Sequence, residues 1–136
     1  MTRILICGDR NWSDYDFILH HLKKYIDEHH PDAIDFVIEG EARGADSLGR
    51  QAAESLGIIV LKFPANWEKF GRAAGPIRNK QMLDEGKPDV VWVFHDDLSK
   101  SRGTNDMIRQ ARKRGVPVYI HSHIIGKDEV VEVIIH

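Results

Sequence analysis

Five short apolar runs, each followed by a stretch with helical spacing, constrain the fold of this chain most strongly. The runs are Arg3–Cys7, Ile34–Glu39, Ile58–Phe63, Asp89–His95 and Val116–Ile120. Nearly continuous apolar runs are typical of parallel strands that are buried on both faces, with the intervening helices as crossovers. The sequence therefore predicts an α/β domain of three layers around a mainly parallel five- or six-stranded sheet. Glu129–Ile135 is the sixth strand, at an edge.

Local signals place the helices between these runs. Ser13 or Asp14 can cap the first helix, which we expect to end at Pro31. Gly57 ends the second helix, and Pro76 suits the first turn of a third over Ile77–Glu85. A fourth helix opens at Gly103-Thr104-Asn105 and closes at Gly115. Residues 64–75 form a long connection, which is uncommon unless it is functional. The adjacent pairs His20-His21 and His29-His30 diverge on a helix, so we expect them to be solvated.

Length and charge limit the class of protein. The 136 residues fit one domain spanning 1–136, and the single Cys7 cannot form an internal disulfide. No long apolar segment or signal peptide is visible, so we expect a cytoplasmic protein without membrane contact. The net charge of −2 argues against a sequence-independent grip on nucleic acid.

Four loops should meet at the carboxyl ends of the strands, where open α/β sheets bind ligands. These loops cover residues 8–12, 40–46, 64–78 and 96–104. They carry five arginines, Arg10, Arg43, Arg72, Arg78 and Arg102. Arginine binds phosphate bidentately, and the glycine-rich turn of residues 39–46 directs a helix N-terminus toward the same edge. We therefore predict a pocket for a phosphorylated small molecule, with Arg78 facing solvent at its rim.

Several motifs are familiar in combination. They are Gly8-Asp9-Arg10, Glu41-Ala42-Arg43-Gly44-Ala45-Asp46, Trp67, Ala74-Gly75-Pro76-Ile77-Arg78-Asn79 with Met82, and Ser101-Arg102-Gly103-Thr104. In this order, over roughly residues 3 to 120, they resemble the YspA-like, cpYpsA-related branch of the SLOG superfamily. The resemblance implies a single Rossmann-like domain that senses or processes nucleotides. Such proteins are common in bacteria and phages, and related proteins often form dimers.

The resemblance extends to the LOG phosphoribohydrolases, which cleave the N-glycosidic bond of nucleoside monophosphates. Arg78 matches their arginine, and Gly103-Thr104 matches the part of their motif that holds phosphate. Their glutamate falls on Met107, which has no acid or base to offer. Other carboxylates that could serve are Glu41, Asp46 and Asp106, although Asp46 also suits the first turn of a helix. Asp96 could hold a ribose or be a solvated loop residue.

Three functions remain open from the sequence. The first is binding of a phosphorylated nucleotide or nucleotide-derived ligand. The second is LOG-like cleavage of a nucleotide by Glu41, Asp46 or Asp106, and the third is DprA-like binding of single-stranded nucleic acid, which the charge disfavours. We favour the first, with a nucleotide-derived small molecule and a second copy of the chain as partners. The expected ligand-binding residues are Gly8, Arg10, Arg43, Gly44, Ala45, Asp46, Trp67, Gly75, Arg78, Asn79, Gly103 and Thr104. No cofactor or metal is expected, since His121 and His123 lack a third ligand.

Overall fold

One mixed sheet forms the centre of the molecule. The structure, a computed structural model, describes residues 1–30, 33–124 and the backbone of 130–133. The strands are β1 (Thr2–Gly8), β2 (Ile34–Glu39), β3 (Ile59–Lys62), β4 (Val90–Phe94), β5 (Val118–His121) and β6 (Val130–Val133). Their order is β3-β2-β1-β4-β5-β6, and only β6 runs antiparallel to its neighbour. The predicted mainly parallel, Rossmann-like sheet is confirmed.

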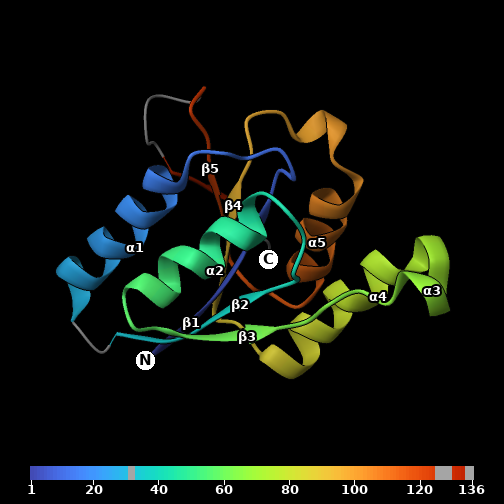
Figure 1. The fold of residues 1–136 in the computed structure, drawn as a ribbon, viewed down its shortest axis with the longest axis horizontal. Helices are drawn as coiled ribbons and strands as arrows, with labels where there is room; N and C mark the ends of the chain where they lie inside the picture. The colour runs from blue at the N-terminus through green and yellow to red at the C-terminus, as the bar shows by residue number, and fades with distance from the viewer. Residues whose placement is uncertain (31–32, 125–129, 134–136) are drawn as a thin grey trace.

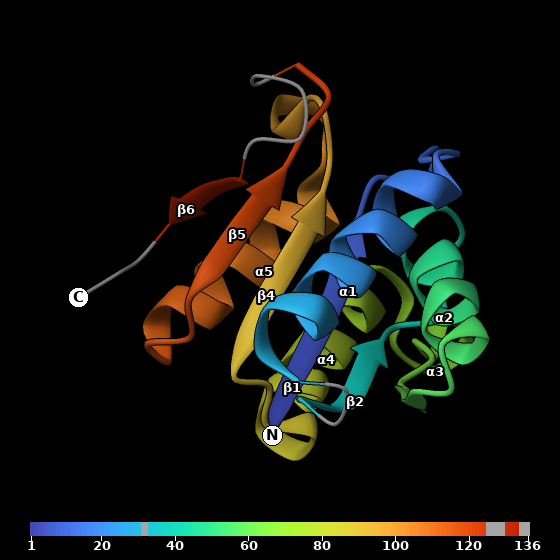
Figure 2. The ribbon, with the colours of Figure 1, turned by 90° about the vertical axis from the view of Figure 1, so that its left-hand side faces the viewer.

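Helices cover both faces of this sheet (Figures 1 and 2). The main helices are α1 (Tyr15–His29), α2 (Ala45–Ser55), α4 (Ala74–Gln81) and α5 (Arg102–Lys113), and α3 (Trp67–Phe70) is a single turn. α1 and α2 lie on one face, while α4 and α5 lie on the other. None of the described helices is long and apolar enough to span a lipid bilayer.

The alternation along β1 explains the three layers. Ile4 and Ile6 are fully buried against α1 and α2, and Leu5 and Cys7 point to the opposite core under α4 and α5. Successive side chains of a strand point to opposite faces, so an unbroken apolar run can serve two cores. This is why each central strand of the sequence is apolar throughout.

The helix boundaries agree with their local signals in most places. Asp14 is the residue that caps α1, since its Oδ1 accepts the N–H of Phe17 at 3.0 Å. α1 ends at His29, and the expected stop at Pro31 lies outside the described residues. The long connection over 64–75 is more ordered than expected, because it contains α3 and the short turn Gly71–Ala73. Asn66 caps α3 by accepting the N–H of Lys69.

The prediction that His21 is solvated is wrong. Its side chain is 6% exposed, and its ring lies 4.8 Å from that of Phe17 and 4.2 Å from that of His121. Phe17 and His21 are four residues apart and therefore share one face of α1, the face that packs on the sheet. His20, one position earlier, is exposed as expected.

Asp96 is a partly exposed loop residue whose carboxylate is hydrogen-bonded within the protein. Its Oδ1 accepts the N–H of His123 at 2.7 Å and the hydroxyl of Ser122 at 3.0 Å. The ring of His123 lies between two carboxylates, with Nδ1 2.9 Å from Asp96 Oδ2 and Nε2 2.8 Å from Asp14 Oδ2. The hydrogen bond to Asp96 is the largest cause of the raised pKa of His123. The loop after β4 is thereby tied to the start of α1.

Candidate functional site

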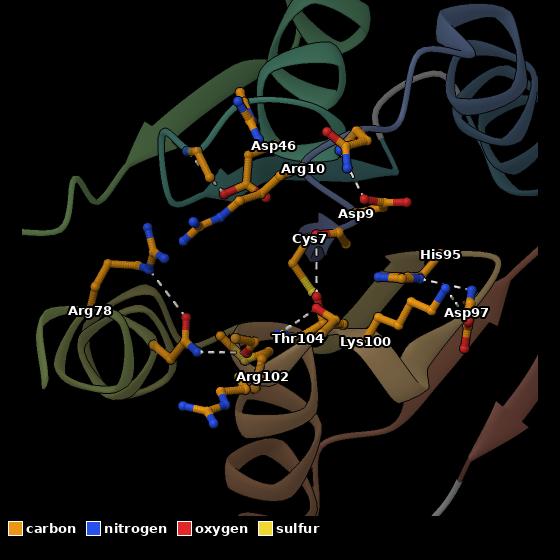
Figure 3. Close-up of a pocket in the computed structure, with 18 of the residues that line it drawn as sticks. Cys7, Asp9, Arg10, Asp46, Arg78, His95, Asp97, Lys100, Arg102 and Thr104 are labelled. Carbon is orange, nitrogen blue, oxygen red and sulfur yellow. Dashed lines mark hydrogen bonds and ion pairs between the residues drawn. The ribbon is translucent and has the colours of Figure 1, made fainter. Parts of the chain in front are cut away.

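A cavity of about 590 Å³ opens at the carboxyl ends of β1 and β4. These strands are neighbours, and the chain leaves β1 toward α1 on one face and β4 toward α5 on the other. Such a switch in chain direction leaves a crevice above the sheet, where open α/β folds bind ligands. The side chains that line the cavity come from the loops after β1, β2 and β4 and from α4 and α5 (Figure 3).

The turn between β2 and α2 is held by its own carboxylate. Asp46 Oδ2 accepts the N–H groups of Gly40 at 3.0 Å and Ala42 at 3.3 Å, and Asp46 is 5% exposed. Gly44 adopts a φ of +75°, and the next N–H, of Ala45, donates to Asp9 O at 3.0 Å. The loops after β1 and β2 are therefore packed backbone against backbone at the edge of the cavity.

Arg78 is buried, so the expectation that it faces solvent is wrong. Only 8% of the residue is exposed, and its guanidinium donates to the carbonyl of Gly40 and, at 3.2 Å, to Asn79 Oδ1. Asn79 Nδ2 in turn donates to Gly103 O at 3.2 Å and Asp106 Oδ2 at 3.0 Å. This path of hydrogen bonds joins the turn after β2 to the first turn of α5, across the floor of the cavity.

The first turn of α5 borders the same cavity. Ser101 caps the helix by accepting the N–H of Thr104 at 3.3 Å, and Thr104 Oγ1 donates to Gly8 O at 3.2 Å. The N–H groups of Arg102 and Gly103 have no carbonyl one turn earlier in the helix to bond. Together with the helix dipole, they favour an anion at this end.

A second cavity of about 580 Å³ adjoins the first. Arg10, Ala42, Arg43 and Arg78 line both cavities. Trp67 lines only the second, where its side chain is 50% exposed and the Arg10 guanidinium lies 5.8 Å from the centre of its ring. The second cavity therefore combines an aromatic face with positive charge.

The expected site residues divide into three groups. Those lining the first cavity are Gly8, Arg10, Arg43, Asp46, Arg78, Asn79, Gly103 and Thr104. Glu41 and Trp67 line the second cavity. Neither cavity is lined by Gly44, Ala45, Gly75 or Asp106. The Asp106 carboxylate instead accepts hydrogen bonds from Asn79 and Gln110 and forms an ion pair with Arg109. Of the five arginines expected at the rim, Arg72 is the one that lies outside both linings.

Several lining residues were not among the expected site residues. They include Asp9, Asn11, His95, Asp97 and Lys100. Each of these lies in the segment that directly follows the buried strand β1 or β4, and that position is the signal that could have identified them. The described residues hold no group of three or more His, Cys, Asp or Glu side chains arranged to bind a metal ion.

Glu39 is a buried carboxyl group whose environment the sequence did not reveal. It is fully buried at the end of β2. Its Oε1 accepts the N–H of Glu41 at 3.0 Å, whereas its Oε2 has no hydrogen-bond partner within the described residues. Burial, and then the charge of Asp46, raise the pKa of Glu39 to about 7. Burial also raises the pKa of Asp46, to about 6, against the opposing effect of Arg78.

We expect Glu39→Gln to stabilise the protein at pH 8. Because the pKa in the folded state lies above the ordinary value of 4.5, Glu39 stabilises the fold below pH 4.5, and this contribution is lost as the pH rises through 7. The neutral amide keeps an acceptor for Glu41 and removes a buried charge. The expected gain in unfolding free energy is on the order of 2 kcal/mol at pH 8. Urea unfolding at pH 8 and pH 5 measures it.

The control is Glu54→Gln on the exposed side of α2, which we expect to change stability little at either pH. A Glu39→Gln variant that is less stable than the parent at pH 8, or gains as much at pH 5, would contradict the assignment of a buried charge at Glu39.

Comparison with known proteins agrees with this structure. The sequence profile of the YspA, cpYpsA-related SLOG family matches residues 2–70, which run from β1 to the end of α3. Over 124 residues the chain is 36% identical to the gene 61 protein of Mycobacterium phage D29, covering 87% of this chain and 94% of that protein. The resemblance seen in the sequence motifs is thereby confirmed, and the chain belongs to the YspA, cpYpsA-related SLOG family.

Proposed function

We propose that this protein binds a phosphorylated nucleotide or nucleotide-derived ligand at the carboxyl ends of β1 and β4. The observation that carries the proposal is the cavity at the switch point, bordered by the first turn of α5. Membership of the SLOG family agrees with a nucleotide-related ligand.

The charges around the cavity favour an anion. Five cationic side chains line it, Arg10, Arg43, Arg78, Lys100 and Arg102, against the three carboxylates of Asp9, Asp46 and Asp97. Arg78 and Asp46 already form hydrogen bonds with the turn after β2. The exposed arginines Arg43 and Arg102 are therefore better placed to bind a phosphate. The half-exposed ring of Trp67 in the adjoining cavity offers a surface on which a base can stack.

The experiment that tests the proposal is incubation of the purified protein with nucleoside mono-, di- and triphosphates, ADP-ribose forms and dinucleotides. Mass spectrometry then identifies the compounds in solution and those retained by the protein. We expect one class of compound to be retained intact. If none is retained at micromolar protein concentration, the proposal is wrong.

The same experiment detects the hydrolase alternative. The observation that favours it is Asp46, a carboxyl group at the cavity whose pKa is raised to about 6, close to working pH. Against it, the cavity is lined by the buried Met107 where LOG enzymes carry glutamate. Free base together with ribose phosphate in the solution would establish cleavage and replace the binding proposal.

We expect Arg43→Gln to weaken retention of the bound nucleotide about tenfold, because one charge-assisted hydrogen bond contributes about 1.5 kcal/mol. Isothermal titration calorimetry measures the change. Arg72→Gln is the matched control, since Arg72 is equally exposed but lines neither cavity. Equal affinities of the two variants would remove Arg43 from the site.

Salt dependence separates a small ligand from single-stranded nucleic acid. Binding to a nucleic acid backbone falls steeply with salt, with a slope that grows with the number of phosphates contacted. Between about 50 and 200 mM salt, an oligonucleotide that releases several counterions would lose much of its affinity. We expect the affinity for the retained nucleotide to fall much less over the same range.

A further inference from the structure

His95 lies at the end of β4 with its ring in the wall of the first cavity. The residue is 6% exposed, and its backbone N–H donates to His121 O at 3.1 Å, which fixes it to the adjacent strand β5. The backbone of His95 is therefore held at the edge of the sheet beside the cavity.

The hydrogen bond at Nδ1 determines where the ring carries its proton. The backbone N–H of Asp97 lies 3.0 Å from Nδ1. A backbone N–H can only donate, so Nδ1 must accept, and a neutral imidazole then carries its proton on Nε2. Nε2 lies at the end of the ring that points into the cavity (Figure 3). Within the described residues, no hydrogen bond satisfies Nε2.

The groups around Nε2 point to the chemistry of its partner. Lys100 and the first turn of α5 line the same cavity, as does Asp97, whose carboxylate lies 3.9 Å from Lys100 Nζ. Apart from that carboxylate, these groups are cations or N–H donors, and a phosphoryl group offers only acceptor oxygens. Since the rest of the residue is buried, Nε2 is the atom through which His95 can donate to a ligand in the cavity.

We propose that His95, in its Nε2–H tautomer, donates a hydrogen bond to a phosphoryl oxygen of the bound ligand. The proposal rests on the proposed function and adds the residue that fixes where the phosphate lies, beside the first turn of α5. Its Nδ1 also anchors Asp97, whose Oδ1 accepts the N–H of Ser99 at 3.1 Å, so His95 helps to position the loop that carries Lys100.

Nuclear magnetic resonance of the ¹⁵N-labelled full chain tests the tautomer directly. The His95 ring signals are those that disappear in His95→Asn. We expect an unprotonated Nδ1 and a protonated Nε2, and we expect the Nε2 signal to shift when pyrophosphate is added. A protonated Nδ1, or an Nε2 signal that pyrophosphate leaves unchanged, would overturn the proposal.

Two variants measure the contribution to binding. His95→Asn retains an oxygen acceptor near the position of Nδ1 for Asp97 but offers no donor toward the cavity. We expect it to remain folded and to bind pyrophosphate about tenfold more weakly, as for one hydrogen bond to a charged group. His20→Asn, on the exposed side of α1, is the control and should bind like the parent.

The outcomes separate this inference from the proposed function. If the parent retains a nucleotide but His95→Asn binds pyrophosphate within twofold of the parent, the role of His95 is refuted and the proposed function stands. If no nucleotide is retained while pyrophosphate shifts the Nε2 signal, the proposed function fails and the donor role of His95 stands. Should His95→Asn not fold, His95→Gln assigns the ring signals instead, and the titration of the parent protein decides.

Discussion

Gly44→Ala is expected to destabilise the protein by at least about 3 kcal/mol. Gly44 has a φ of +75° and a ψ of −125°, a sparsely populated combination that costs a residue with a Cβ on the order of 1–3 kcal/mol. In addition, a Cβ at this position would lie 2.3 Å from Asp9 O and 2.5 Å from the backbone of Arg10. Backbone atoms cannot yield as a flexible side chain can, so the loops after β1 and β2 must separate. Urea unfolding monitored by tryptophan fluorescence measures the loss.

Gly57→Ala provides a matched control for this effect. Gly57 has nearly the same φ, +74°, but a Cβ there would have no atom within 4 Å. We therefore expect it to lose about 1 kcal/mol, the conformational cost alone. The difference between the two variants reports the contact between the two loops together with the more restricted backbone conformation of Gly44. Equal losses would show that the loops can move apart at no cost and that the edge of the cavity is not fixed by this contact.

Arg78→Ala is expected to destabilise the protein by about 3 kcal/mol, because this arginine is buried and does not face solvent as the sequence predicted. Removing the guanidinium leaves the Gly40 carbonyl without its donor and the carboxylate of Asp46 without its nearest compensating charge. Leaving a buried carbonyl without its donor and a buried carboxylate without a nearby positive charge costs far more than losing a surface ion pair. Because the same variant releases the turn after β2, we also expect weaker ligand binding.

Two further variants test this explanation. Arg72→Ala removes an exposed arginine near the start of α4 and should change stability by less than about 0.5 kcal/mol. Adding Asp46→Asn to Arg78→Ala removes the uncompensated charge and should restore part of the lost stability at pH 8. If the double variant loses more unfolding free energy than the two single variants lose together, the coupling between Arg78 and Asp46 is not electrostatic.

The sequence predicted the layers well because they depend on local patterns. The unbroken apolar runs identified all five parallel strands, and capping residues such as Asp14 and Gly57 marked helix ends to within a few residues. The same patterns placed the loops that border the cavity, since the carboxyl ends of parallel strands meet at one edge. They could not show that residues 67–73 are helical, because such short turns depend on a single cap such as Asn66.

By itself, then, the sequence determined a Rossmann-like sheet, the edge at which a ligand is expected, and the family to which the chain belongs. Only the tertiary structure decided what individual side chains do there. Arg78 is buried because it meets Gly40, 38 residues away, and the backbone of His95 is held by the carbonyl of His121 on β5. Burial, pKa and hydrogen-bond partners depend on atoms that distant segments bring together, and these do not follow from periodicity. The carboxyl groups of Glu39 and Asp46 are the clearest case, since burial is the largest cause of their raised pKa values.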